Sequence, residues 1–552
     1  MKTLRIFLIL FLALFIFSYD LHAQVTYNFW VLLSDKTNSP FSFSSPEAFL
    51  SDRAIQRRSV QFIALDMKDI PVDPAYRSAV IAINGVQYRY ASKWFNALAI
   101  RCDSASMLQV AALPFVTEVR RAITIKYDHK QIIDERIPAE IGITLMNQRL
   151  PIDYGLSANQ IMDMNGQVLH DLGYTGQGMV MAILDSGFDN VDSMLAFADL
   201  RNEGRILSTH DFVQGDEEVY DEHSHGRYVL STIAGIIPGL AYGTAVSASF
   251  HLLRTEDVDS ETTVEEYNWI AAAEYADSAG ADVLNTSLGY TDFDSLQVSY
   301  TYEDMDGNTA WITRGADIAA SRGMLIVNSA GNSGNGAFHY ISAPADGDSV
   351  LAVGSVNPDS LHTGFSSFGP SFDGRVKPNV CAQGFQSIGV NRDDVVVAIN
   401  GTSFSSPILA GMATCLWQAV PGATNMEVFN AIQMSADHYS DPNDSLGYGI
   451  PNFGVALELL QEMVGLYELE SSKTLLFPNP VQDQFQVLLE PGMDRSSISI
   501  QAIDMKGSKL ELSFKFNSEQ SVQIDAWNLS MGMYTLIIQN NTHRLNMRFI
   551  KE

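Results

Sequence analysis

The strongest constraint on the fold is an alternation of apolar and helical segments between residues 156 and 465. Five short apolar segments read as buried strands: GMVMAILDSG, ASFHLLRTED, ADVLNTSLG, GMLIVNSAG and DSVLAVGSV. The helical segments between them include TVEEYNWIAAAEYADSAG and AWITRGADIAASRG. Apolar strands separated by helices predict an α/β domain, with a parallel sheet covered by helices on both faces. Such a sheet carries its chemistry at the carboxyl ends of its strands.

Polar residues stand at these strand ends and at the helix starts. Asp185 ends the strand-like MVMAILD, and Asn332 follows another strand in IVNSAGNSG. His225 begins a helix in HSHGRYVLSTIAG, where Gly226 allows a tight turn into the helix. Ser403 lies where a strand turns into a helix in AINGTSFSSPILAG. A carboxylate at the end of a buried strand is costly unless it has a partner, so Asp185 is expected to have one.

Aspartate, histidine and serine complement one another chemically. A serine hydroxyl is a weak nucleophile that needs an adjacent base, and imidazole titrates near neutrality. A buried carboxylate fixes the imidazole tautomer and stabilises its charged form. The backbone N–H of Ser403 and the side-chain amide of Asn332 are candidate donors to a developing oxyanion. Each residue alone is weak support, because aspartate and asparagine are usual in turns; the four together predict nucleophilic catalysis.

These motifs resemble those of the subtilisin-type serine peptidases, or subtilases, over residues 160 to 460. The matching stretches are AILDSGFD, HGRYVLSTIAG, SAGNSG and GTSFSSP. The resemblance implies a subtilisin-like fold with Asp185, His225 and Ser403 as the triad, in the family's chain order. It implies that Asn332 completes the oxyanion hole.

The stretch LNTSLGY resembles the family's strand that binds the substrate backbone. The resemblance implies that Ser287, Leu288 and Gly289 form one wall of the substrate cleft. An extended peptide would pair with this wall as an added strand.

Two histidines compete for the role of base. The family's base is directly followed by glycine, which selects His225, so His223 is expected to be a solvated loop histidine. The sequence departs from the family at Arg227 and Tyr228, where threonine and histidine are usual, so the local pocket is expected to differ in shape. Phe404 replaces a methionine that is usual after the nucleophile, which should make the site less sensitive to oxidation.

The flanking regions predict further domains. Residues 1–23 have a basic start, an apolar stretch and a small residue at the cleavage point, as a secretory signal peptide does. Residues 24–153 read as a small α+β unit with a polar linker and resemble subtilase propeptides. The peptidase domain is expected over 154–465. Residues 468–552 read as a β-sandwich and resemble the sorting domain of the type IX secretion system.

Charge and cysteine content narrow the function classes. Residues 156–465 hold nine basic and forty acidic residues, which argues against nucleic-acid binding. Three cysteines in 552 residues, Cys102, Cys381 and Cys415, exclude a disulfide scaffold and are expected to be small buried side chains. No segment after the signal peptide is expected to span a membrane.

No cofactor is required for this chemistry, although many relatives bind structural calcium. The best local candidate is YEDMDGNT, with Asp304, Asp306 and Asn308 at alternate positions, but the stretch lacks the glycine and glutamate of an EF-hand loop. A polar turn is the alternative.

The sequence therefore predicts a serine endopeptidase made as a precursor, acting on protein or peptide substrates. The resemblance of residues 468–552 to the sorting domain implies export through the periplasm of a Gram-negative bacterium, by the type IX machinery, into the medium or onto the cell surface. Self-cleavage is expected between Tyr127 and Leu156, and the charge contrast between prosegment and acidic domain should make their association salt-sensitive. One alternative is an inactive subtilase-fold adhesin or scaffold. A lipase-like hydrolase would need a G-x-S-x-G motif, which GTSFS does not supply.

Overall fold

The computed structural model describes residues 25–122, 152–293, 299–465, 475–489, 498–504, 509–518, 521–540 and 544–551. The chain divides into two compact units, residues 1–419 with 424–453, and residues 420–423 with 454–552. The predicted signal peptide and most of the predicted linker lie outside the described residues. The predicted domain boundaries at 153 and 465 stay predictions.

The first unit begins with an N-terminal module, residues 25–122, built on an antiparallel sheet of order β2-β3-β1-β4. Its strands are β1 (Tyr27–Leu33), β2 (Gln87–Ser92), β3 (Ala97–Cys102) and β4 (Val116–Ala122). Its helices are η1 (Pro46–Ala48), α2 (Asp52–Val60), α3 (Pro74–Ile81) and α4 (Ser104–Ala111). The sequence did not predict α3, although Asp73 caps it and Pro74 occupies its first turn.

The rest of the first unit is the central domain, whose parallel sheet of seven strands confirms the predicted α/β class. The strand order is β13-β12-β11-β10-β5-β9-β6. The strands are β5 (Val180–Asp185), β6 (Ile206–Asp211), β9 (Ser249–Arg254), β10 (Val283–Thr286), β11 (Leu325–Ser329), β12 (Val350–Val356) and β13 (Val380–Gln383). The sequence did not predict β6 and β13. These are the edge strands; β6 is polar and partly exposed, and β13 is only four residues long.

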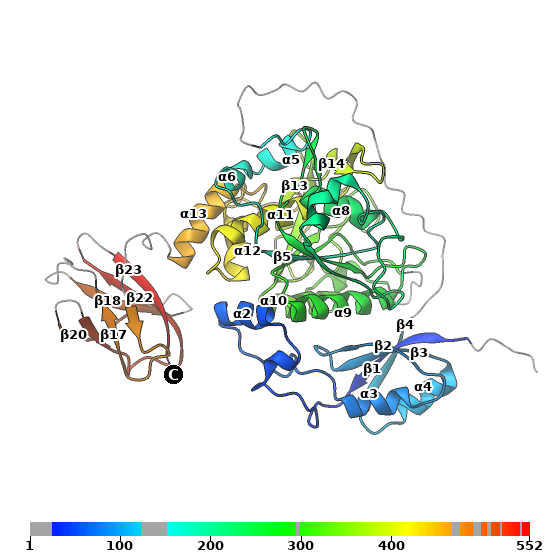
Figure 1. Ribbon diagram of the computed structural model, residues 1–552, viewed down its shortest axis with the longest axis horizontal. Coiled ribbons are helices and arrows are strands. Elements are labelled where there is room, and N and C mark those ends of the chain that lie inside the picture. Colours follow the sequence, from blue (N-terminus) through cyan, green and yellow to red (C-terminus); the bar gives the residue numbers. More distant parts are fainter. Residues whose placement is uncertain are drawn as a thin grey trace, which may run out of the picture. The chain divides into compact units, whose positions relative to one another are not determined.

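Helices cover both faces of this sheet (Figure 1). On one face lie α9 (Thr263–Ala279) and α10 (Trp311–Ser321), and on the other lie α8 (His225–Ala234) and α11 (Thr402–Ala419). The smaller helices are α5 (Ala158–Met162), α6 (Gln167–Asp171), η2 (Leu195–Phe197), α7 (Ala198–Asn202), η3 (Tyr302–Asp304) and α12 (Asn425–Met434). Short hairpins are formed by β7 (Ile236–Ile237) with β8 (Ala241–Tyr242), and by β14 (Ser387–Val390) with β15 (Val396–Ile399).

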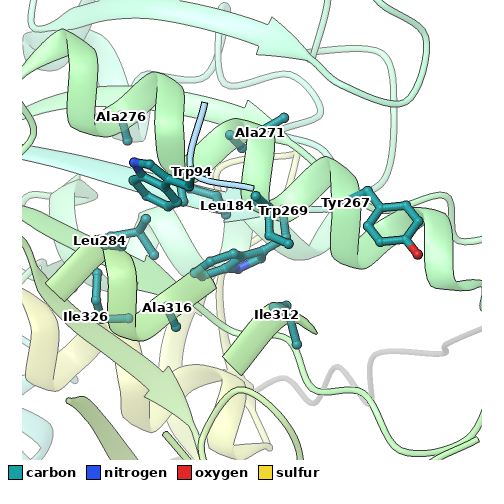
Figure 2. Packing of buried hydrophobic residues seen from close by; sticks show 14 of the residues in the cluster. Trp94, Leu184, Tyr267, Trp269, Ala271, Ala276, Leu284, Ile312, Ala316 and Ile326 are labelled. Carbon is teal, nitrogen blue, oxygen red and sulfur yellow. The ribbon is translucent and has the colours of Figure 1, made fainter. Parts of the chain in front are cut away.

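The N-terminal module and the central domain share one hydrophobic cluster along α9. Trp30 of β1 is fully buried and stacks on Tyr267, with ring centroids 4.4 Å apart and planes 11° from parallel. Trp94 is also buried and lies beside Ala276 of α9 (Figure 2). Trp269 points from α9 toward the parallel sheet, where its indole N–H donates to Oγ1 of Thr286, the last residue of β10, at 3.1 Å. Helix α9 is therefore buried on both sides.

A buried ion cluster joins the same two parts. Asp277 of α9 is fully buried, and its carboxylate receives Arg57 Nη2 at 2.5 Å, Arg58 Nη2 at 2.9 Å and Lys93 Nζ at 2.9 Å. All three cations come from the N-terminal module. Three cations around one carboxylate compensate its burial, so its pKa falls well below its ordinary value.

The second unit contains α13 (Phe453–Val464, its first residue in unit 1) and two antiparallel four-stranded sheets. The first sheet has the order β16-β17-β21-β20 and the second β19-β18-β22-β23. The strands are β16 (Leu475–Phe477), β17 (Gln484–Leu488), β18 (Ser499–Asp504), β19 (Lys509–Glu511), β20 (Phe514–Phe516), β21 (Ser521–Asp525), β22 (Gly532–Gln539) and β23 (Arg544–Lys551). Both sheets contribute to one core, which includes Phe485, Ile500, Ile524 and Phe549. This is the predicted β-sandwich. Within the described ranges, every helix of the chain is too short or too polar to span a bilayer.

Candidate active site

The carboxyl end of β5 faces the first turn of α8. Asp185 is the last residue of β5 and fully buried, and His225 is the first residue of α8. His225 Nδ1 lies 2.8 Å from Asp185 Oδ1 and 3.0 Å from Oδ2. The carboxylate therefore holds the imidazole through Nδ1, which leaves Nε2 as the nitrogen available for proton transfer.

The glycine after this histidine is required by close packing. A Cβ on Gly226 would lie 2.4 Å from the carbonyl oxygen of Gly187 and 2.9 Å from the Cβ of Asp185. Helix α8 can approach the strand end closely enough for the Asp185–His225 bond only because this position carries no side chain. The sequence suggested a tight turn as the reason for this glycine, whereas the structure shows that close packing is the reason.

The electrostatics of the pair favour a charged imidazole. Burial would lower the pKa of His225, but the carboxylate of Asp185 and the more distant Glu256 act against it, so the pKa is raised from its ordinary value of 6.5. Asp185 Oδ1 also accepts from the N–H and the hydroxyl of Ser186, at 2.7 and 3.2 Å. These bonds keep the carboxylate fixed while it stabilises an imidazolium.

The expectation for His223 was wrong about its surroundings. It is half-buried rather than solvated, and its Nδ1 lies 3.0 Å from Ser186 Oγ and 3.4 Å from the backbone nitrogen of His225. Burial and the neighbouring His225 lower its pKa. The Ser186 hydroxyl thus links His223 to the Asp185 carboxylate.

Ser403 lies in the first turn of α11, directly after a sharp backbone turn. Gly401 has a φ of +145°, which a side-chain-bearing residue rarely adopts, and the helix begins at Thr402. Ser403 and His225 line the same cleft, and the Phe404 ring lies 5.8 Å from the His225 ring, with the two planes tilted by 36°. The hydroxyl of Ser403 donates to the Ser287 carbonyl at 3.3 Å. No hydrogen bond joins it to His225 among the contacts of the described residues.

Pro407 lies inside α11, as the sixth residue of the helix. Proline has no N–H to bond the carbonyl four residues earlier, which is that of Ser403. That carbonyl instead accepts from Ser287 Oγ at 2.8 Å. The proline therefore frees a carbonyl that ties the start of α11 to the neighbouring strand end.

Asn332 faces the cleft with a defined amide orientation. Its Oδ1 accepts from the N–H and the hydroxyl of Thr402, at 2.9 and 3.0 Å. With the oxygen engaged twice, the Nδ2 group is left as the donor on the cleft side. The sequence did not indicate this role of Thr402, since its partner lies 70 residues away.

Ser287, Leu288 and Gly289 follow β10 and line the cleft, which has a volume of about 700 Å³. Behind them, Ser406 donates to Asn285 Oδ1 at 2.8 Å, and Asn285 Nδ2 lies 3.4 Å from Ser287 Oγ. This buried link between α11 and β10 had no recognisable signal in the sequence.

Arg227 and Tyr228, which depart from the family's residues after the catalytic histidine, are both buried in the fold. Arg227 is buried, pairs with Asp189 at 2.6 Å and donates to the Val390 carbonyl at 2.9 Å. Its guanidinium also lies over the ring of the buried Tyr228. Neither residue lines the cleft. The three cysteines are buried and unpaired, as predicted.

The residues suggested for calcium turn their side chains toward local backbone. Asp304 accepts from Thr301, and Asp306 accepts from the N–H groups of Asn308 and Thr309 at 2.8 and 2.7 Å. Across the described residues, no group of three or more acidic, histidine or cysteine side chains is arranged to hold a metal ion. The stretch does not fit a calcium site, because its carboxylates already accept local hydrogen bonds.

A buried carboxylate on an imidazole, with a helix-start serine in the same cleft of a parallel sheet, defines the class of serine hydrolases. The comparisons agree with this class. Residues 176–450 match the subtilase family, residues 28–136 the peptidase S8 propeptide domain of Bacteroidota, and residues 475–552 the secretion system C-terminal sorting domain.

Three curated relatives show the extent of the similarity. Subtilisin from Bacillus pumilus is 30% identical over 311 residues, which cover 56% of this chain and 99% of the relative. Subtilisin NAT from Bacillus subtilis subsp. natto is 29% identical over 368 residues, 66% of this chain and 81% of the relative. M-protease from Shouchella clausii (strain KSM-K16) is 27% identical over 317 residues, 57% and 72% of the two chains.

The chain belongs to the subtilase family, and the predicted resemblance is confirmed. It is a subtilase-type serine peptidase with a propeptide domain and a type IX sorting domain. The sorting domain marks it for secretion to the cell surface or beyond.

Proposed function

We propose that the protein is a secreted endopeptidase in which Ser403 attacks the peptide carbonyl. His225 accepts the serine proton and returns it to the leaving amine, and Asp185 holds the imidazole. The observation that carries the proposal is the short bond between His225 Nδ1 and the buried Asp185 carboxylate, in the cleft that contains Ser403.

The first step requires a rotation of the nucleophile. The Ser403 hydroxyl rests on the Ser287 carbonyl and has to turn toward Nε2 of His225. Catalytic hydrogen bonds are often formed only when substrate is bound, so this resting geometry is compatible with the mechanism. The same peptide that triggers the reaction would pair with residues 287–289 as an added strand.

Two donors support the tetrahedral intermediate. The Ser403 N–H belongs to the first turn of α11 and has no carbonyl of the same helix to bond. The Asn332 amide is oriented by Thr402 and donates from the other side. The proposed mechanism uses no metal or cofactor.

The route of export is also part of the proposal. The first 23 residues would direct the chain across the inner membrane of a Gram-negative bacterium. The type IX machinery would then recognise the sorting domain in the periplasm and export the chain. The N-terminal module would inhibit the peptidase until the chain cuts itself within the linker.

Labelling with a fluorophosphonate tests the catalytic assignment and separates it from the inactive-scaffold alternative. Wild type should be labelled and should hydrolyse casein, and Ser403→Ala should do neither while remaining folded. His225→Ala should abolish labelling, whereas the matched change His223→Ala should retain most activity. A wild-type protein that is folded but neither labels nor cleaves would be a scaffold.

A further inference from the structure

One wall of the cleft is strongly acidic. It is formed by Glu256, Asp257, Glu261, Glu265 and Asp292, here called the acidic wall. Among the described residues that line the cleft, none is lysine or arginine, and the catalytic His225 is the one basic side chain. The wall therefore gives the cleft a negative field on the side of β9 and α9.

Two of these carboxylates are buried and held by neutral donors. Glu256 is 8% exposed and accepts from the Tyr290 hydroxyl and from Thr255 Oγ1. Glu265 is 2% exposed and accepts from the N–H groups of Thr262 and Asp257, at 2.6 and 3.1 Å. Neutral donors orient a carboxylate but do not cancel its charge.

Among the described residues, Arg254 is a cation that acts on the acidic wall, and it is already paired with two other carboxylates. Arg254 stabilises the charged form of Glu256, but its guanidinium pairs with Asp211 at 2.7 Å and Glu222 at 3.2 Å. Burial raises the pKa of Glu256 to about 7, with a further contribution from Asp185, and burial together with Glu256 raises that of Glu265. The wall thus has the electrostatics of a site that gains free energy when a cation arrives.

A second observation shows that the cleft is built for a polar ligand. The hydroxyl of Ser342 is buried and has no hydrogen-bond partner among the described residues. A Cβ on Gly289 or Gly331 would fall 2.1 or 3.0 Å from that oxygen, so the hydroxyl lies between two residues that line the cleft. An unpaired buried hydroxyl in a binding cleft indicates a partner supplied by the ligand.

We propose that the acidic wall is a subsite for the side chain of a substrate lysine or arginine, at one fixed position relative to the scissile bond. This inference rests on the proposed function. The aliphatic stem would lie against Leu288 and Phe293, and the charged end would reach the buried carboxylates. A free metal ion is the less suitable occupant, because the carboxylates of the described residues are not arranged as a metal-binding group.

Matched fluorogenic peptides test the subsite on the self-processed enzyme. Each peptide carries lysine or norleucine at one position, and fluorophosphonate titration gives the active enzyme concentration. The lysine peptide should be preferred in kcat/KM on the order of 10- to 100-fold at one position, the range expected for a hydrogen-bonded charge. Glu265→Gln, which keeps an acceptor oxygen for one of the two backbone N–H groups, should lower that ratio at least about tenfold, as should Glu256→Gln, where one oxygen accepts both bonds. The exposed carboxylate of Asp441, outside the cleft, gives the control Asp441→Asn, which should leave the ratio unchanged.

The outcomes separate this inference from the proposed function. A titratable enzyme that cleaves lysine and norleucine peptides equally at every position overturns the subsite alone, and this needs only the wild type. A protein that cannot be titrated overturns the proposed function. The inference is also wrong if the acidic wall is a metal site. In that case millimolar calcium would raise the melting temperature, Glu265→Gln would remove that rise, and chelation would leave the peptide preference unchanged.

Discussion

Replacing Asp277 by asparagine should weaken the attachment of the N-terminal module to α9. The substitution preserves the shape of the side chain but removes the one carboxylate that faces Arg57, Arg58 and Lys93. Each of these side chains is at most 9% exposed, so water cannot replace the lost charge. Removing one partner of a buried ion pair costs about 3–5 kcal/mol.

The remaining contacts place the expected loss at the lower end of that range. Arg58 keeps Asp69 at 2.8 Å, and Lys93 keeps Ser278 Oγ at 2.7 Å. Arg57 keeps backbone carbonyls, including that of Arg322 at 3.3 Å. Each cation thus retains an acceptor, and we expect a loss of about 3 kcal/mol, which corresponds to about a 100-fold change in an equilibrium constant.

Hydrogen exchange of α2 measures this loss in the intact precursor. Ser403→Ala in both samples should keep the chain uncut, and exchange of the α2 amides reports the local opening equilibrium. Asp277→Asn should accelerate that exchange about 100-fold. Arg53 also contacts the central domain, through Asp282, but its side chain is 39% exposed. The control Arg53→Gln should therefore cost less than about 1 kcal/mol, or about fivefold.

Salt provides the second arm of the experiment. The charge contrast in the sequence predicts a salt-sensitive association, whereas the buried Asp277 cluster is screened poorly. The ratio between Asp277→Asn and its parent should thus be nearly the same in low and in molar sodium chloride. If Asp277→Asn accelerates exchange no more than Arg53→Gln does, the reasoning from burial is refuted.

Asn332→Ala should lower kcat about 10²- to 10³-fold with little change in KM, a magnitude measured on the relative subtilisin; a change confined to KM would make Asn332 a pocket residue. Because the pKa of His225 is raised and the base must be neutral, kcat/KM should fall as the pH drops through a value above 6.5. Asp185→Asn should move that limb to lower pH in a pH–rate profile, and an unmoved limb would contradict the pairing. Ser403→Ala should remain an uncut precursor by intact-mass analysis, and the same new N-terminus as in wild type would exclude self-cleavage. Deleting residues 470–552 should leave active enzyme in the periplasm, and efficient export of the shortened chain would argue against the sorting role.

The sequence predicted the parts of the fold that have strong local signals. The five inner strands of the central sheet are buried and rich in apolar residues because both of their faces are covered. The edge strand β6 has neighbours on one side only and carries polar residues, so its sequence resembles a loop. The helix α3 was missed because a helix of eight residues is too short to show a clear period, and only its capping aspartate and proline mark it.

The candidate site shows the same division. Asp185, His225, Asn332 and Ser403 stand beside glycines in recognisable motifs, and the structure places all four around one cleft or directly behind it. The residues that orient them could not be predicted, because each acts on a partner distant in sequence. Thr402 on Asn332 is an example.

The contacts of the N-terminal module with α9 had no sequence signal at all. Lys93 and Asp277 are 184 residues apart, and nothing in either segment identifies the other as its partner. Burial of a charge depends on the tertiary fold, whereas a sequence shows only that a charge is present.

The stacking of Trp30 on Tyr267 gives the precursor an optical signal of its own maturation. Trp30 and Trp94 are two of the six tryptophans in the chain, and both are shielded from water where the N-terminal module meets α9. Departure of the module transfers both indoles to solvent and ends the contact of Trp30 with the tyrosine ring. Indole emission shifts to longer wavelength in water. Activation of this precursor can therefore be followed continuously by intrinsic fluorescence, with no label and no substrate.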